Sequence, residues 1–425
     1  MSVSKPKLEL KLRNTTPLLV GWYESHKQDR MGIRVTEIKG IWRWWCRAFI
    51  AGAMYDMNIL SGMNDENIYL IPTGEEVEAI SCFVGKILGL GYAGKKGAES
   101  SRFKLSIKTD SSLKPIEFRK NKTEYQRIKL LTLKNPVEGI NTGYTFTLSV
   151  EKVREKYRDA ENLALKILVV SLQLSGVGKG GRRGLGSLDI ISIDPRDIIV
   201  CNNIECFIKH IYEESIKVIE KYQEICEDKN VKQVPNNRLP PLPVVSENVF
   251  KLYRVNIRNY QSFIDIHQFF VRTERCQVLY GKKICYDELR KTYNAWFLGL
   301  PREQKRTGYT ILVEHVVRRP SPIFITYHEN NNIFGSGVFV SIFLSGDWPK
   351  SLEWKSVLRK TEQNKEKELK KLEESVGKEQ PIKTINIDEK KIMEAYETFI
   401  KEFKDYLNRK RLTLQEIKWR CEKNG

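Results

Sequence analysis

The sequence predicts an α+β fold built from two tandem ferredoxin-like domains with additional helices. Over residues 7–193 the expected elements follow the order strand, helix, strands, helix, strand, with one extra strand or hairpin. This is the β-α-β-β-α-β pattern of a ferredoxin-like domain. A second, more divergent set of strands and helices begins near residue 251. A chain of 425 residues is also too long to fold around one ordinary hydrophobic core. We expect a first domain over 1–200, a long helix with a proline-rich linker over 201–250, and a second domain over 251–425.

The elements of the first domain follow from apolar periodicity. Residues 7–14 alternate apolar and charged side chains, as a half-buried strand does. Residues 36–57 read as a helix with Thr36 as its N-cap, and the buried face predicted by helical spacing consists of Ile41, Trp44, Trp45, Ala48 and Phe49. Further strands are predicted at 103–108, 127–134, 144–151 and 185–193, and a second helix at 155–175.

The second half is less regular. Residues 201–228 predict a long helix, and the proline-rich residues 234–245 predict a linker or extended arm. The remaining predictions are strands at 251–258, 309–317, 321–328 and 336–344, and helices at 286–300, 353–374 and 388–420.

The charge balance indicates a polyanionic partner. Seventy-two Lys and Arg residues against 53 Asp and Glu residues give a net charge of +19. Nucleic acid is the commonest partner for an excess of this size, and the alternative is a lysine-rich surface without a specific ligand.

The eight cysteines lack zinc-ligand spacing, so we expect no metal and reduced thiols that serve mainly as core residues. The N-terminal residues lack the apolar core of a signal peptide, and no run of eighteen apolar residues follows. We therefore expect a soluble, cytoplasmic protein without membrane contact.

The stretch SGVGKGGRRGLGSL, residues 175–188, holds six glycines and three cations. Gly176, Gly178 and Gly181 satisfy GxGxxG, but a dinucleotide-binding loop follows a strand and opens a helix, whereas this one follows a helix and enters a strand. Glycines permit positive φ and expose backbone N–H groups. The loop therefore suits the phosphates of a polymer, and the alternative is a basic turn that caps the helix. The residues expected at the ligand are Gly178, Lys179, Gly180, Gly181, Arg182, Arg183, Gly184 and Gly186.

A second group of cations lies on the first predicted helix. Lys39, Arg43 and Arg47 are spaced by four and form one stripe, which together with the glycine loop could line a groove. The alternative for this stripe is an ordinary solvated face. Trp42 lies off the predicted buried face and could stack on a base.

These segments resemble the RAMP superfamily of CRISPR-associated RNA-binding proteins, whose ferredoxin-like domains carry a glycine-rich loop after the last helix. VSLQLSGVGKGGRRGLGSL (170–188) looks like that loop. More narrowly, TTPLLVGW (15–22), RVTEIKGIWRWWCRAF (34–49), LGLPR (298–302) and RRPSPI (318–323) resemble the family of first-numbered subunits of the Cmr complex, the type III-B effector.

The resemblance implies a non-catalytic RNA-binding subunit of a guide-RNA-dependent antiviral complex, without a cofactor. Its implied partners are single-stranded RNA, as guide or target, and the other Cmr subunits. By position, Lys39, Arg43 and the loop glycines would face RNA, and so would Arg318 and Arg319, unless that pair supports the junction between domains.

Two other functions stay open. Related RAMP proteins are metal-independent endoribonucleases, and His26, in the loop after the first strand, could act as a general base with Lys39 stabilising the transition state. The third hypothesis is an architectural subunit without RNA contact.

Overall fold

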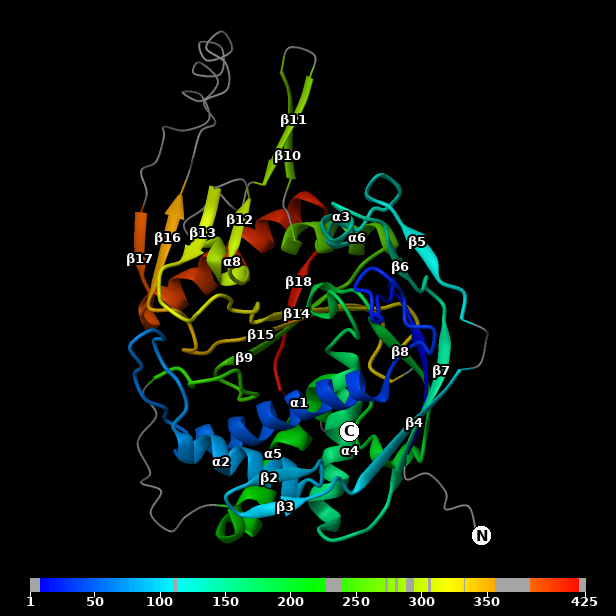
Figure 1. The fold of residues 1–425 in the computed structure, drawn as a ribbon, viewed down its shortest axis with the longest axis vertical. Helices are drawn as coiled ribbons and strands as arrows, with labels where there is room; N and C mark the ends of the chain where they lie inside the picture. The colour runs from blue at the N-terminus through cyan, green and yellow to red at the C-terminus, as the bar shows by residue number, and fades with distance from the viewer. Residues whose placement is uncertain are drawn as a thin grey trace, which may run out of the picture.

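The computed structural model describes residues 8–109, 113–226, 238–271, 274–279, 282–287, 294–304, 307–331, 333–355 and 383–419. The chain forms two units of similar organisation, each with a four-stranded antiparallel sheet (Figure 1). The α+β class is thereby confirmed. The domain limits at residues 200 and 250 stay predictions, because one continuous apolar core runs through both units. No helix in the described ranges is long and apolar enough to cross a membrane.

The first unit has the sheet order β4-β7-β1-β8, with every neighbouring pair antiparallel. Buried and exposed residues alternate along β1 and β7, which places one face of the sheet against the helices. Its elements in chain order are β1 (Leu8–Asn14), α1 (Val35–Asp56), β4 (Phe103–Thr109), β7 (Thr145–Lys152), α4 (Arg158–Gln173) and β8 (Leu188–Asp194).

The second unit repeats this order of connections, with the sheet order β14-β15-β9-β18. Strands β14 and β15 are buried along their whole length. Trp44 and Trp45 of α1 pack on Phe324 and Phe343, and Phe263 of α6 stacks on Tyr327 of β14. Its elements are β9 (Phe250–Val255), α6 (Tyr260–Val271), β14 (Ile323–His328), β15 (Gly337–Phe343), α8 (Glu389–Arg409) and β18 (Leu414–Ile417).

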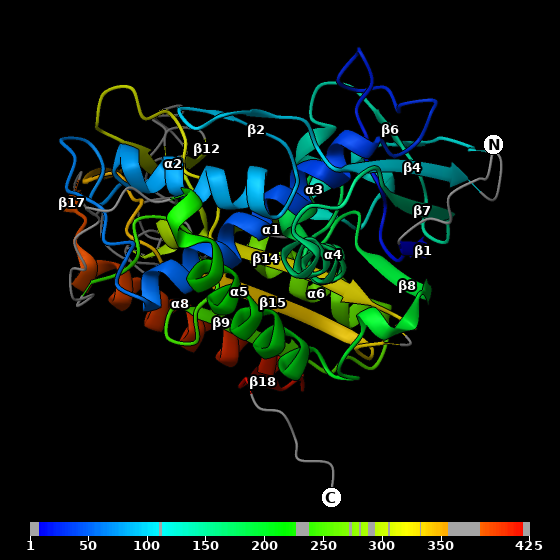
Figure 2. The ribbon, with the colours of Figure 1, turned by 90° about the horizontal axis from the view of Figure 1, so that it is seen from below.

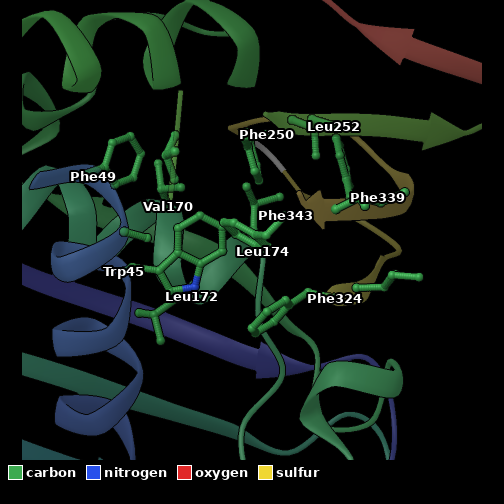
Figure 3. Packing of buried hydrophobic residues seen from close by; sticks show 14 of the residues in the cluster. Trp45, Phe49, Val170, Leu172, Leu174, Phe250, Leu252, Phe324, Phe339 and Phe343 are labelled. Carbon is green, nitrogen blue, oxygen red and sulfur yellow. The ribbon is translucent and has the colours of Figure 1, made fainter. Parts of the chain in front are cut away.

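Helix α1 joins the two units, and Figure 2 shows it lying over β14 and β15. The Trp45 ring lies 5.5 Å from Phe343 of β15 and 6.2 Å from Phe324 of β14, measured between ring centroids (Figure 3). The Trp45 Nε1 donates to the Ser175 hydroxyl at 2.6 Å, so this buried aromatic ring also fixes the start of the glycine loop.

Inserted elements surround the two sheets. The long helix predicted at 201–228 is α5, which ends at Cys226. Four of the inserted strands, β12 (Arg302–Gln304), β13 (Thr307–Ile311), β16 (Ser351–Lys355) and β17 (Lys383–Asn386), form a third four-stranded sheet. Other inserted elements in the described ranges are α2 (Gly74–Cys82), a π-helical turn (Phe83–Ile87), β2 (Tyr92–Gly94), β3 (Gly97–Glu99), β5 (Ile116–Phe118), α3 (Gln126–Leu131), β6 (Val137–Gly139), α5 (Ile204–Cys226), β10 (Glu274–Leu279) and β11 (Lys282–Asp287).

Several local predictions are wrong. The strand predicted at 127–134 is wrong, because α3 spans Gln126–Leu131 and RIKLLTLK fits a short helix as well as a strand. The helix predicted at 286–300 is not found in its described part. Residues 286 and 287 belong to β11, and Ala295–Leu298 form a 3-10 turn, while residues 288–293 lie outside the described ranges. Of the helix predicted at 353–374, residues 353–355 belong to β16, and the rest lie outside the described ranges. Thr36 does not cap α1, whose N-cap is Arg34.

The proline-rich segment is part of the core in its described portion, 238–245, and is no solvated arm there. The Val245 amide donates to the Ala48 carbonyl at 2.8 Å, and Val244 and Val245 are fully buried. Gly52 of α1 makes this approach possible, because a Cβ there would lie 2.0 Å from the Val245 carbonyl oxygen.

The expectation of reduced thiols is wrong for one pair. Cys82, at the end of α2, and Cys226, at the end of α5, form a disulfide with a Cα–Cα distance of 5.5 Å. Helices α2 and α5 are distant in sequence, so this bond is a long-range cross-link, with its cysteines 144 positions apart.

Candidate nucleic-acid interface

A cleft of about 1400 Å³ opens between the two units. Its walls are the glycine loop, one face of α1, the residues around α3, and two segments of the second unit, 298–302 and 318–321. Seven cations line it, against a single carboxylate, Glu37, among the described lining residues. The cationic residues are Arg127, Lys179, Arg182, Arg183, Arg302, Arg318 and Arg319.

The glycines of the loop allow the backbone to fold tightly on itself. Gly178, Gly180, Gly184 and Gly186 have φ between 66° and 83°, in the left-handed region that favours glycine. A Cβ at Gly186 would lie 2.0 Å from the Val177 carbonyl oxygen. The expectation that the glycines expose successive amides is wrong in part, because the amides of Val177, Lys179, Gly181, Arg183, Leu185 and Gly186 bond to carbonyls of the protein.

The loop cations contact the walls of the cleft. The Arg182 Nη1 donates to the Ser321 carbonyl at 2.9 Å, and its guanidinium lies 4.7 Å from the centroid of the Phe324 ring. Arg183 donates to the Leu298 carbonyl, and the Lys179 Nζ donates to the Ser25 carbonyl. Arg182 and Arg183 therefore connect the loop to the second unit, while Lys179 connects it to the loop after β1.

Arg127, Arg182 and Arg183 form the floor of the cleft, and their positive charge is poorly compensated. Burial, followed by the charges of Arg302 and Arg127, lowers the pKa of Arg183 to about 9. Burial and the charge of Arg319 lower the pKa of Arg182 to about 10. The Arg183 Nη1 and Arg127 Nε are buried and have no hydrogen-bond partner in the described part of the chain. An anion in the cleft would supply both the missing acceptors and the missing charge.

His267 supports this floor from α6 and is fully buried. Its Nε2 accepts from the Arg127 amide at 3.1 Å, so the proton lies on Nδ1, which is 2.7 Å from the Arg183 carbonyl oxygen. Burial, with the charges of Arg183 and Arg127, lowers the pKa of His267 to about 4. A neutral imidazole thus positions two arginines without adding charge.

Arg318 and Arg319 have different environments. Arg318 is exposed at the cleft. Arg319 is buried, and its Nη2 forms an ion pair with the Asp347 Oδ1 at 2.7 Å while its guanidinium lies 4.0 Å from the Trp348 ring centroid. Arg319 therefore holds the wall of the second unit, and Arg318 is the member of the pair that a ligand can reach.

The predicted stripe on α1 faces away from this cleft. Glu37, Gly40, Ile41 and Trp44 line it, whereas Lys39, Arg43 and Arg47 do not. The Arg43 guanidinium bonds to the Leu90 carbonyl instead. The expectation that the stripe and the glycine loop line one groove is wrong for this cleft.

Trp42 is not available for stacking. It is fully buried, and its Nε1 donates to the Ala164 carbonyl at 2.6 Å. Trp44, expected on the buried face, is half-buried and lines the cleft, 5.7 Å from the Arg182 guanidinium.

His26 lies outside the cleft lining, on the loop between β1 and α1. Its Nε2 is 3.2 Å from the Glu24 Oε2, and both side chains are partly exposed. Within the described residues no group of three or more His, Cys, Asp or Glu side chains has an arrangement that could hold a metal.

Sequence reasoning missed Arg127, Arg302 and Glu37 as cleft residues. Arg302 belongs to the segment 298–302, which carries part of the family resemblance, so its position near the glycine loop is predictable from the sequence. The sequence predicts a strand at Arg127 and a helix at Glu37, but it predicts no functional role for either side chain. Only the packing of α3 and α1 brings these two side chains to the loop.

Residues 11–189 match the family model described as the RAMP superfamily, which confirms the superfamily resemblance and includes the glycine loop. No curated protein matches the sequence.

Solved structures similar to the chain have low sequence identity. Cmr1 from Pyrococcus furiosus in its apo form is 16% identical with a TM-score of 0.49, covering 96% of this chain and 98% of that one. A chain of the type III-B Cmr-beta complex bound to cognate target RNA is 14% identical with a TM-score of 0.46, covering 80% and 94%. A chain of that complex with target RNA, AMPPnP and ssDNA is 15% identical with a TM-score of 0.48, covering 94% and 100%.

Proposed function

Because residues 11–189 belong to the RAMP superfamily, we propose that the cleft binds single-stranded RNA and that the chain is a non-catalytic subunit of a guide-RNA-dependent type III-B effector complex. The RNA would be the guide, the target or both, and the other Cmr subunits would be its protein partners.

The density of positive charge in the cleft carries this proposal, although Arg319 is paired with Asp347. Seven cations face one carboxylate, and burial together with mutual repulsion lowers the pKa values of Arg182 and Arg183. Keeping like charges this close costs stability unless a ligand neutralises them. A polymer of phosphates supplies several negative charges in a row, which matches a row of cations better than a single small anion does.

The four segments that carry the narrower resemblance converge on the cleft. Its lining includes Leu19 and Gly21 from 15–22, the Glu37–Trp45 face of α1 from 34–49, residues 298–302 entirely, and 318–321 from the last segment. Segments nearly 300 positions apart in sequence thus meet around one ligand site. This convergence supports the assignment to a type III-B complex, because the residues typical of those subunits form a shared surface.

The topology agrees with an RNA-binding scaffold. We infer that both units are ferredoxin-like domains, since each joins a β-α-β-β-α-β order of elements to an antiparallel sheet with the same strand order. RRM-type domains of this topology bind single-stranded RNA. Here the glycine loop of the first domain and the 318–321 segment of the second line the same cleft and are in contact through Arg182 and Ser321.

One experiment separates the three functions. An end-labelled single-stranded RNA is incubated with the full chain in EDTA over a series of salt concentrations, and each sample is divided between a native and a denaturing gel. We expect retarded, intact RNA whose affinity falls steeply as salt rises. Cleavage that His26→Ala abolishes would make the chain an endoribonuclease, and RNA neither bound nor cut would favour an architectural subunit.

A further inference from the structure

The single carboxylate in the described lining of the cleft, Glu37, has no role in phosphate binding. It lies in the first turn of α1, whose next lining residues are Gly40, Ile41 and Trp44. A carboxylate repels phosphates, so its presence among seven cations weakens rather than strengthens a purely electrostatic grip.

The cations beside Glu37 are engaged elsewhere. Arg34 pairs with Asp29 and donates to the Gly21 carbonyl at 2.8 Å, and the Lys179 Nζ donates to the Ser25 carbonyl. The Glu37 Oε2 is buried and has no hydrogen-bond partner within the described residues. Burial raises the pKa of Glu37, although the charge of Arg34, a hydrogen bond from the Arg34 backbone and the charge of Lys179 act in the opposite direction. A buried acceptor without a donor is costly, so a ligand that donates a hydrogen bond to this oxygen would be stabilised in the cleft.

The helix dipole does not explain this burial. An acidic residue in the first turn stabilises a helix through its charge, and it does so from an exposed position. Glu75 in the first turn of α2 is such a residue, since it is exposed and does not line the cleft. Glu37 differs from Glu75 in being turned into a cationic cleft.

A ligand group that satisfies the Glu37 Oε2 must donate a hydrogen bond. Trp44, which lies near the Arg182 guanidinium, is seven residues along α1, or roughly 10 Å at the rise of an α-helix. Glu37 and the Arg182 guanidinium can therefore contact different parts of one RNA strand. Between them Ile41 and Trp44 offer apolar surface to a ribose or base.

We propose that Glu37 accepts a hydrogen bond from a ribose 2′-hydroxyl and thereby makes the cleft select RNA over DNA. The inference rests on the proposed RNA binding and names the chemical group that the cleft distinguishes. The 2′-hydroxyl is the donor that every ribonucleotide carries and every deoxyribonucleotide lacks. A base amino group would give preference for particular bases instead, and the test separates the two.

The experiment is a double-mutant cycle between Glu37 and the 2′-hydroxyl, measured with the full chain. Affinities are determined for one RNA sequence and for a set of copies, each with a single 2′-deoxynucleotide at a different position. Wild type should lose roughly tenfold in affinity at one position, the loss typical of a hydrogen bond to a charged group. Glu37→Ala should show no loss there, Glu37→Gln a reduced loss, and Glu75→Ala the full loss.

Glu37→Ala should also bind single-stranded DNA at least as tightly as wild type does, because a repulsive charge has been removed. The proposal is wrong if each single 2′-deoxynucleotide weakens RNA binding by the same factor in wild type and in Glu37→Ala. It is also wrong if wild type prefers RNA with a particular base at one position and Glu37→Ala loses that preference. If wild type binds no RNA at all, the proposed function itself fails. Far-UV circular dichroism of each variant verifies that α1 is folded.

Discussion

His328 of β14 and Asp189 of β8 form a fully buried contact between the two sheets, with the His328 Nδ1 3.0 Å from the Asp189 Oδ1. The other ring nitrogen, Nε2, lies 2.8 Å from the Gln173 carbonyl oxygen at the end of α4. Both ring nitrogens thus lie within hydrogen-bond distance of acceptors. The contact fixes the end of α4 and the start of β8 relative to the second unit, and the glycine loop lies between these two points.

Asp189→Asn should destabilise the fold by about 3 kcal/mol at pH 7, because it removes the buried carboxylate that His328, the Asn330 amide and Arg13 all contact. Burial raises the pKa of Asp189, but the hydrogen bond and charge of His328 outweigh it, so the folded-state pKa is below its usual value. A depressed carboxylate pKa stabilises the fold above about pH 4 and loses this effect as the pH falls through the folded-state pKa.

Urea unfolding at pH 7, 5 and 3.5 tests this expectation. The difference between wild type and Asp189→Asn should be largest at pH 7 and shrink at pH 3.5. Asp197→Asn, at an exposed aspartate, should change the free energy of unfolding by less than about 0.5 kcal/mol. A difference that is constant over the three pH values would show that the charge of Asp189 has no part in it.

The first sheet and its helices were predictable because their signals are local. Alternation along 7–14 and 144–151 and helical spacing over 36–57 and 155–175 identify β1, β7, α1 and α4 to within a few residues. Helix α6 was not predicted, although its buried residues Phe263, Ile266, His267 and Phe270 follow helical spacing.

The cleft was predictable only in part. The glycine loop and the segments 298–302 and 318–323 were singled out from sequence, but which face of α1 meets them depends on contacts that no local pattern encodes. Trp44 packs 4.8 Å from Phe324 of β14, measured between ring centroids, and this contact turns Glu37 and Gly40 into the cleft. The cationic stripe, on another side of the same helix, is thereby turned away.

Gly186→Ala should destabilise the fold by at least about 2 kcal/mol, since the new Cβ meets the Val177 carbonyl oxygen at 2.0 Å and φ is 66°. Gly40→Ala is the matched control within the same cleft, because no atom lies within 4 Å of its added Cβ. It should stabilise α1 by about 0.5–1 kcal/mol. Thermal unfolding of both variants gives the comparison, and a neutral Gly186→Ala would contradict the tight fold of the loop.

Replacing Cys82 and Cys226 by Ser should lower the free energy of unfolding by about 2–5 kcal/mol, because the bond closes a long loop, with its cysteines 144 positions apart. Denaturant titration of wild type and the double variant without reductant measures the loss. Alkylation of the unreduced native protein, followed by mass spectrometry, provides the check. Modification of both cysteines by the reagent would show that they are not bonded to each other.

The cations inside and outside the cleft should differ in their effect on RNA affinity. Lys179→Ala combined with Arg318→Ala removes two reachable charges from the cleft without touching the Arg182 and Arg183 contacts that join the units. Each lost phosphate contact reduces the slope of log affinity against log salt by about 0.7 for a single strand, so the pair should reduce it by about 1.4. Lys39→Ala combined with Arg47→Ala removes the same charge from the α1 stripe, outside the cleft, and should leave the slope nearly unchanged. Equal reductions by the two pairs would mean that RNA responds to the overall charge of the protein, whereas a reduction by the Lys39 and Arg47 pair alone would move the binding surface to the other side of α1.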